Sequence, residues 1–183
     1  MITTATSLFN QKSYTSIGVD CIIAESGVAK MTFYKYFSSK ENLIEECLHR
    51  RNLEVQASLF NKISNIDDPL IKLKSIFNWY IGWINKDDFN GCLFKKATIE
   101  VMQLYPSLKD QVNEYREWIY KLVFSIFLEL EIKDAHTLTR LFINIIDGII
   151  IDGTINKSQI NPTKTWSYIK KIIKFEKTLE CAT

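Results

Sequence analysis

Basic and hydroxyl-bearing side chains gather in one short stretch near the amino terminus. Lys30, Lys35 and Lys40 lie there with no acidic residue among them, and Tyr34 and Tyr36 flank the second lysine. Ammonium groups pair with phosphates, and tyrosine hydroxyls donate hydrogen bonds to phosphate oxygens. These residue types favour binding to a nucleic acid. A short amphipathic helix with three lysines is equally compatible with an ordinary solvent-exposed surface.

The charge of the whole chain does not itself indicate nucleic-acid binding. The 23 basic and 21 acidic residues leave a formal net charge of +2. Any basic surface must therefore be local, and the stretch from residue 28 to residue 40 supplies one.

Other residues capable of chemistry are scattered. The four cysteines form no CxxC pair, so the sequence suggests neither a zinc site nor a compact disulfide framework, and we expect reduced thiols. His49 and His136 have no Ser, Cys or carboxylate partner at a readable spacing. We therefore expect no catalytic site, no cofactor and no metal.

Aromatic residues, 13% of the chain, suggest a second kind of site. Aromatic walls with a few polar groups suit an apolar or flat ligand held between helices. A stripe of aromatic residues at helical spacing is also typical of a plain core, so that alternative stays open. The candidate pocket residues are Trp79, Tyr80, Trp83, Phe94, Met102, Tyr105, Tyr115 and Trp118.

The elements that carry these residues are expected to be helices. Only 6 glycines and 3 prolines punctuate 183 residues, too few for the frequent turns of a sandwich or barrel. Each proline follows a residue at which a helix could begin, and apolar residues recur at steps of three and four after Pro106. The predicted fold class is all-α, with helices over about 2–12, 18–25, 29–36, 39–64, 69–86, 92–104, 107–130, 134–155 and 162–178.

The change from short to long helices predicts two domains. We place a helix-turn-helix domain at residues 1–45 and a larger helical bundle at residues 46–183. The longest apolar stretch, Leu141 to Ile151, is too short to span a membrane, and the amino terminus has no signal-peptide pattern. We expect a cytoplasmic protein with no membrane partner.

One segment carries a family resemblance. Gly27 separates two short helical patterns, as in a helix-turn-helix. The run IIAESGVAKMTFYKYFSSKENL closely resembles the DNA-binding domain of the TetR family of bacterial transcriptional regulators. The resemblance implies a three-helix DNA-binding domain followed by a helical ligand-binding and dimerisation domain.

The resemblance also implies roles for individual residues. Lys30, Thr32, Tyr34, Lys35 and Tyr36 match family positions that touch DNA. Met31 occupies a variable position that often faces the bases. Lys40, in the first turn of the next helix, is expected to hold a further phosphate.

Three departures from the family pattern concern DNA affinity. The chain begins inside or just before its first helix, without the basic residues that often precede it, so some phosphate contacts are expected to be missing. Ser13 stands where the family usually has Gly, and Ile17 where Thr or Ser often caps the second helix. We expect Ser16 to cap that helix one residue early.

The remaining two thirds resemble the family less specifically. NGCLFKKATIE, residues 90–100, is similar to a segment of one branch of TetR-like ligand-binding domains, in which the last two long helices pair with those of a second subunit. That resemblance implies a homodimer through helices 134–155 and 162–178. The sequence offers for such an interface Gly148, Gly153, Trp166, Ile169, Ile172 and Ile173. The same apolar faces would also suit the core of a monomer. Asp147 could pair with Arg140, pair with a polar group of the partner subunit, or face the pocket, and a paired structural carboxylate is the favoured interpretation.

The function hypothesis is a dimeric regulator, most often a repressor in this family, that binds double-stranded operator DNA. A small-molecule effector in the larger domain would modulate its DNA affinity. The alternative is a helical small-molecule binding protein that has lost specific operator binding, motivated by the curtailed amino terminus. A helical enzyme is a third class, for which the sequence offers no catalytic cluster.

Overall fold

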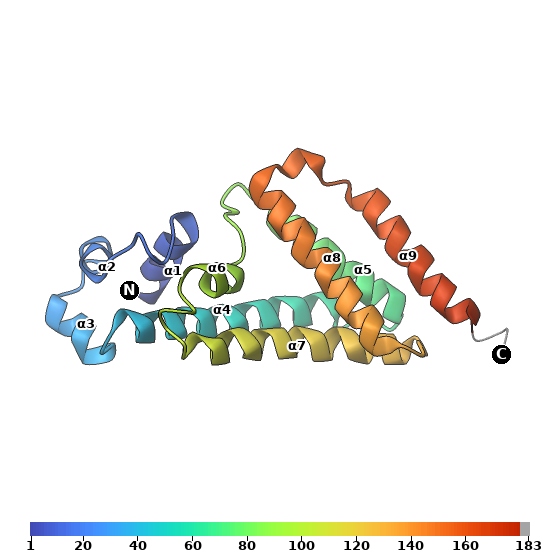
Figure 1. Ribbon diagram of the computed structural model, residues 1–183, viewed down its shortest axis with the longest axis horizontal. Helices are drawn as coiled ribbons and strands as arrows, with labels where there is room; N and C mark the ends of the chain where they lie inside the picture. Colours follow the sequence, from blue (N-terminus) through green and yellow to red (C-terminus); the bar gives the residue numbers. More distant parts are fainter. Residues whose placement is uncertain (180–183) are drawn as a thin grey trace. The chain divides into compact units, whose positions relative to one another are not determined.

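The structure is a computed structural model that describes the backbone of residues 1–179. Every regular element in those residues is helical, which confirms the predicted fold class (Figure 1). The elements are α1 (Ile2–Gln11), α2 (Val19–Ser26), α3 (Lys30–Tyr36), α4 (Lys40–Ile63), α5 (Pro69–Ile84), α6 (Leu93–Glu100), α7 (Leu108–Glu129), α8 (Ala135–Ile155), a 3-10 turn η1 (Lys157–Gln159) and α9 (Pro162–Leu179).

The helix bounds follow the capping chemistry of the sequence. Asp68 accepts hydrogen bonds from the N–H groups of Leu70 and Ile71 at 2.8 and 3.0 Å, directly before α5. Pro69 lies in the first turn, where its missing N–H is not needed. Asn161 caps α9 in the same way, through a 3.0 Å bond from the N–H of Lys164. The helix starts marked by Pro69 and Pro162 are therefore confirmed, and α7 begins at Leu108, two residues after Pro106.

Helix α6 differs most from its predicted bounds. The sequence predicts a helix to residue 104, but α6 ends at Glu100, and residues 101–104 form turns. Val101 has φ −137° and ψ −5°, outside the helical region. Apolar spacing continues past Glu100, so periodicity alone does not mark this end.

By packing, the chain divides into two compact units, which are described separately. The first contains residues 1–56 and 90–115, and the second contains residues 57–89 and the chain from Arg116 onward. Helix α6 thus belongs with the amino-terminal helices. The predicted domain boundary near residue 45 rests on the change from short to long helices and stays a prediction, which did not include the return of residues 90–115 to the first unit.

The first unit is organised around Tyr14, in the loop between α1 and α2. The Tyr14 ring is fully buried against Phe9, with ring centroids 4.8 Å apart. The Tyr14 hydroxyl donates to the Leu93 carbonyl at 3.2 Å, and its N–H donates to the Glu100 carboxylate at 2.7 Å. Lys96 donates to the Asn10 carbonyl at 2.6 Å. Helix α6 therefore holds the end of α1 and the α1–α2 loop through these polar contacts.

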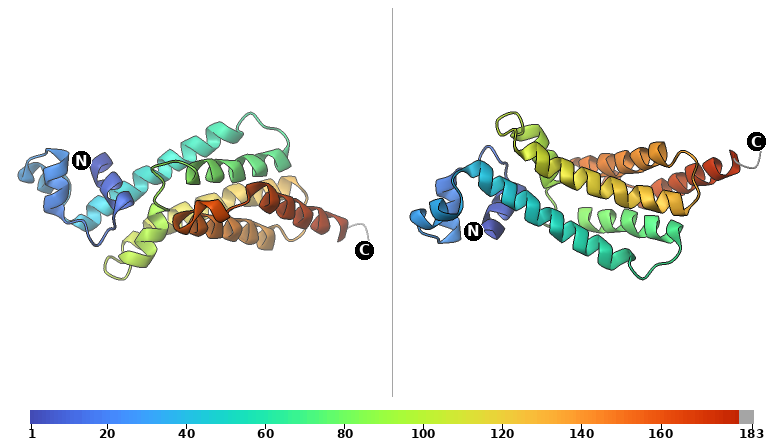
Figure 2. Two further views of the ribbon diagram at one scale, coloured as in Figure 1. Left: turned by 90° about the horizontal axis from the view of Figure 1, so that it is seen from above. Right: turned by 90° about the horizontal axis from the view of Figure 1, so that it is seen from below.

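In the second unit, α5 packs against α8 and α9 (Figure 2). Gly153 of α8 permits close approach within the chain, since a Cβ there would lie 2.5 Å from the Cγ2 atom of Ile84. Trp166 of α9 contacts Phe77 of α5, with ring centroids 5.6 Å apart.

These contacts change the expected dimer surface. Trp166, Ile169 and Ile173 are buried inside the chain, and Ile172 is half-buried. Gly153 packs against α5. Four of the six residues predicted for the dimer interface are thus buried within a single chain, Trp166 against α5 and Ile169 and Ile173 beside residues of α7 and α8. Gly148, with no atom near its would-be Cβ, and the half-buried Ile172 remain open to such an interface, which stays a prediction.

Across residues 1–179, none of the helices combines the length and the apolar character needed to cross a membrane.

Candidate nucleic-acid interface

The turn between α2 and α3 has the geometry that its glycine predicts. Gly27 ends α2 with φ +65° and ψ 16°, a left-handed conformation that glycine adopts without steric cost. The chain then enters α3 two residues later, after Ala29 in an extended conformation. The predicted helix-turn-helix is therefore confirmed.

The predicted cap of α2 is wrong. The N-cap of α2 is Gly18, with no side-chain hydrogen bond. Ser16 turns back to Ser13 instead, and its N–H donates to the Ser13 hydroxyl at 3.0 Å. A serine hydroxyl can bond to nearby backbone as readily as it caps a helix, and the local turn wins here.

One side of α3 is fixed by burial. Phe33 is fully buried, and its ring contacts those of Tyr34 and Phe37, at centroid distances of 5.1 and 5.9 Å. A seven-residue helix has two turns, so anchoring Phe33 directs the residues at neighbouring positions outward.

The outward face of α3 carries most of the residues predicted to touch DNA. Met31 is 86% exposed, Tyr36 67% and Tyr34 51%. Lys30 and Lys35 are exposed as well, and Thr32 is half-buried beside them. This face combines cations, hydroxyl groups and one flexible apolar side chain on a single convex helix. It therefore offers hydrogen-bond donors and positive charge to an extended polyanion.

Lys30 has an ionic partner that sequence reasoning missed. Its Nζ atom lies 3.1 Å from the Asp20 carboxylate of α2, and both side chains are mainly exposed. The hydrogen bond to Asp20 raises the pKa of Lys30. Exposed ion pairs contribute little stability, so a phosphate can replace Asp20 at small cost. The Lys35 ammonium lies 5.9 Å from the ring centroid of Tyr36.

Lys40 lies apart from that face. Its ammonium group donates a hydrogen bond to the Tyr14 carbonyl, and burial lowers its pKa. Ser39 caps α4, since its hydroxyl accepts the N–H of Asn42 at 3.1 Å. Lys40 therefore helps to join α4 to the α1–α2 loop in the free protein. Its partner lies far away in the sequence, and no local spacing indicates it.

The eight candidate pocket residues fall into several groups. Trp79, Tyr80 and Trp83 contact one another along α5, with centroid distances from 4.9 to 6.3 Å. Phe94 and Tyr115 stack in the first unit, with centroids 4.1 Å apart and rings 5° from parallel.

The other three candidates, Met102, Tyr105 and Trp118, are half-buried. The eight residues are shared between the two units, and ligand contact at any of them stays a prediction.

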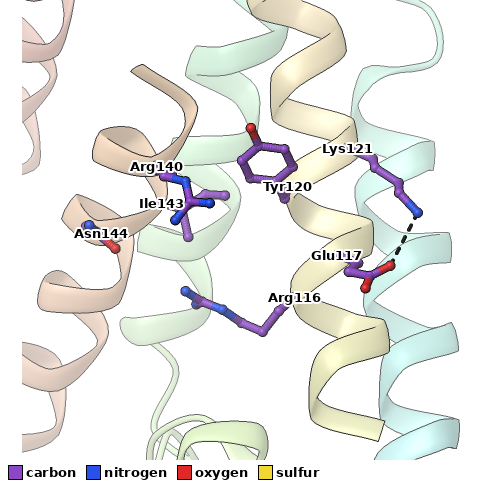
Figure 3. Close-up of a pocket in the computed structure, with 7 residues that line it drawn as sticks. All are labelled: Arg116, Glu117, Tyr120, Lys121, Arg140, Ile143 and Asn144. Atoms are coloured by element: carbon purple, nitrogen blue, oxygen red, sulfur yellow. Dashed lines mark hydrogen bonds and ion pairs between the residues drawn. The ribbon is translucent and has the colours of Figure 1, made fainter. Parts of the chain in front are cut away.

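A pocket of about 370 Å³ lies elsewhere, between α7 and α8 of the second unit (Figure 3). None of the eight predicted residues lines it. Asp147 approaches it from α8 and pairs with Arg116 at 2.5 Å. Asp147 is thus a paired carboxylate, as the sequence favours, and its ionic partner is Arg116 of α7.

Residues 1–179 hold no group of three or more His, Cys, Asp or Glu side chains that could bind a metal ion. Cys21, Cys47 and Cys92 are free thiols, and Cys181 lies outside the described residues.

Comparison with known sequences agrees with the helix-turn-helix geometry. Residues 1–47 match the family model described as bacterial regulatory proteins, tetR family. An HTH-type transcriptional regulator from Lactococcus lactis subsp. lactis is 28% identical over 146 residues, which cover 77% of this chain and 67% of that protein.

Comparison with solved structures extends the likeness to the rest of the chain. A TetR-family transcriptional regulator from Streptomyces coelicolor superimposes with a TM-score of 0.84 at 20% identity, over 94% of this chain and 92% of the other. FadR from Bacillus subtilis, crystallised in complex with stearoyl-CoA, gives a TM-score of 0.74 at 18% identity, over 94% and 95%. At these identities the likeness shows the fold alone. Residues 1–47 are therefore similar to the TetR family of bacterial regulatory proteins, and the chain has the fold of TetR-family regulators along nearly all its length.

Proposed function

We propose that this chain is a transcriptional regulator that binds operator DNA through α3 and responds to a small-molecule effector. The outward face of α3 carries the proposal, since Lys30, Met31, Tyr34, Lys35 and Tyr36 are all exposed there above a buried Phe33. A helix of this size enters a major groove with its outward side chains toward the bases. The place of action would be the cytoplasm, where bacterial DNA lies.

Different parts of this face suit different roles. Lys30 and Lys35 can neutralise phosphates, and the Tyr34 and Tyr36 hydroxyls can donate to phosphate oxygens and so fix the register. Met31 and Thr32 would face base edges. Lys40 contributes to DNA binding mainly by holding the loop around Tyr14, with its remaining N–H donors available to a phosphate.

A homodimer would supply the specificity that one short helix lacks. Two copies of α3 related by a two-fold axis would read two half-sites of a near-palindrome. Exposed apolar side chains on α8 and α9 support such an interface. They are Ile151, Ile155, Tyr168 and Phe175. This set replaces the buried residues named from the sequence.

Repression and effector control rest on likeness to other proteins. A protein of the same fold, FadR, is known in complex with stearoyl-CoA, so this fold can hold a small molecule. DhaR from Mycobacterium sp., named a transcriptional repressor, is 22% identical over 65% of this chain and 60% of its own length. We infer repression that is relieved when an effector binds more tightly to the state with weak DNA affinity.

Fluorescence anisotropy tests DNA binding, with labelled duplexes from upstream of the protein's own gene and its neighbours. We expect affinity that falls with salt, and a slope of log K against log salt that decreases by about 1 in Lys35→Ala. Lys109→Ala is the matched control, because Lys109 is an exposed lysine of the same unit outside α3. Absence of salt-sensitive binding to every such duplex would favour the alternative, a small-molecule binding protein that has lost operator binding.

A further inference from the structure

The pocket between α7 and α8 carries a concentration of positive charge that the proposed DNA interface does not use. Its walls come from one face of each helix, and its volume of about 370 Å³ lies within the range of small-molecule sites. The lining residues are Arg116, Glu117, Tyr120, Lys121, Arg140, Ile143 and Asn144.

Most charges at this pocket are already compensated. Arg116 pairs with Asp147 at 2.5 Å, and Lys121 pairs with Glu117 at 3.4 Å. The remaining cation is Arg140, which has no hydrogen bond or ion pair with any residue in the described part of the chain. The pocket therefore has one uncompensated positive charge.

The two arginines are arranged to act together. Arg116 extends from α7 toward α8, Arg140 comes from α8, and both side chains line the pocket (Figure 3). Two planar guanidinium groups in one pocket match the oxygens of a carboxylate or phosphate better than lysines would. The Asp147 contact holds Arg116 in place, which lowers the entropy cost of binding.

The rest of the wall suits a ligand with an apolar or aromatic body. Tyr120 projects its ring into the same space from α7, and Ile143 is buried beneath it from α8. The Tyr120 ring is held by a hydrogen bond to His136 and by stacking on Phe124, at a centroid distance of 5.8 Å. Asn144 lies one turn after Arg140 and adds an uncharged donor and acceptor.

We propose that this pocket binds a small organic anion, with its carboxylate or phosphate between Arg140 and Arg116 and its body against Tyr120 and Ile143. The inference deepens the proposed function, since it names the chemical class of the effector and the place where it binds. It does not use the eight pocket residues predicted from the sequence. The proposed dimer surface and the pocket use different side chains of α8.

The test uses benzoate and inorganic phosphate as probes, with benzamide as the uncharged counterpart of benzoate. Isothermal titration of the full chain should show binding of one or both anions with Kd at or below about 1 mM, and much weaker binding of benzamide. A preference for benzoate assigns a carboxylate with an aromatic body, whereas a preference for phosphate assigns a phosphorylated ligand.

The decisive variant is Arg140→Gln, which removes the uncompensated charge from an exposed position and should leave folding intact. We expect it to weaken anion binding about tenfold or more, while Arg140→Lys retains part of the affinity. Lys133→Gln is the matched control, because Lys133 is exposed in the same unit outside the pocket. Circular dichroism shows whether each variant is folded.

Several results would overturn the proposal. These are no anion binding at about 10 mM, equal binding of benzamide, or unchanged affinity in Arg140→Gln. Loss of the dimer in Arg140→Gln, without anion binding by the parent protein, would assign Arg140 to the subunit interface instead.

DNA binding, measured on the same samples, separates this inference from the proposed function. Wild-type protein that binds DNA but no anion disproves the pocket alone, whereas anion binding without DNA binding disproves the regulator.

Discussion

Helix α3 and the pocket edge of α8 both present arginine or lysine side chains to solvent, but their geometries differ. The α3 surface is convex and comes from one helix of seven residues. The pocket is concave, and its two arginines come from helices α7 and α8. DNA is recognised by a convex helix that enters its major groove, whereas a small molecule binds in a concave pocket formed by several elements. A local sequence pattern can therefore reveal the first kind of site but not the second.

The two regions also differ in how their cations are held. Lys30 has an exposed partner in Asp20, and the other α3 lysine is open to solvent, so both can exchange partners at small cost. Arg116 is held by the half-buried Asp147, which fixes one half of the anion site in advance. The lysines of α3 can thus adjust their positions to the phosphates of a bound DNA. In the pocket, by contrast, the Arg116 guanidinium is already held in place before an anion binds.

The largest expected effect comes from removing the aromatic support beneath each region. Phe33→Ala and Phe142→Ala each truncate a buried ring and should lower the free energy of unfolding by about 3–5 kcal/mol. Urea unfolding followed by circular dichroism measures the loss. Under conditions where both variants stay folded, Phe33→Ala should impair DNA binding and spare anion binding, and Phe142→Ala should do the reverse. Equal loss of both activities in either variant would contradict independent support of the two sites.

The next effect depends on pH and is confined to the first unit. Burial raises the pKa of the Cys47 thiol from 9.0 to about 11. The protonated thiol is favoured in the folded state, so its contribution to stability is fully present below about pH 9 and is lost as the pH rises through about 11.

Compared with Cys47→Ala, the parent protein should lose about 2 kcal/mol of unfolding free energy between those pH values. Unfolding at a series of pH values gives the difference between the two proteins. A constant difference across this range would show that the thiol ionises equally in both states. In the folded protein Cys47 should also react with iodoacetamide more slowly than the half-buried Cys21.

A smaller effect is expected at the carboxylate that holds the α1–α2 loop. Glu100→Ala leaves the Tyr14 N–H without its 2.7 Å acceptor and should cost about 1–2 kcal/mol. Glu114→Ala is the matched control, because that glutamate is exposed on α7. We expect weaker DNA binding from Glu100→Ala alone, measured by anisotropy. Identical behaviour of the two variants would mean that α6 does not position the DNA-binding helices.

The smallest effect on stability should accompany a clear loss of DNA binding. Tyr34→Ala removes a half-exposed ring and should change the free energy of unfolding by no more than about 0.5 kcal/mol. Its DNA affinity should fall about tenfold for operator and unrelated sequences alike, because the hydroxyl is assigned to a phosphate. Phe60→Ala, an exposed aromatic of α4, is the control. Unchanged DNA affinity in Tyr34→Ala would remove it from the interface.

The predictions from the sequence that were confirmed concern contacts between residues close together along the chain. Pro69 and Pro162 mark helix starts, and Gly27 marks the turn, because each residue acts on backbone conformation within a few positions. Ser16 does not cap α2 because local bonding competes for its hydroxyl, which donates to the Ser13 carbonyl at 3.3 Å. The end of α6 was missed because apolar periodicity continues into a turn.

The helical class, the helix-turn-helix and the residues that α3 turns outward can be predicted from the sequence alone, since these depend on short-range spacing and on burial of Phe33. Three other features follow from packing in the folded chain: Trp166 and Ile169 belong to its core, Lys40 binds the Tyr14 carbonyl, and Arg116 pairs with Asp147. Each of these contacts joins residues from different elements. Their partners are chosen by the packing of whole helices, which periodicity along one helix does not specify.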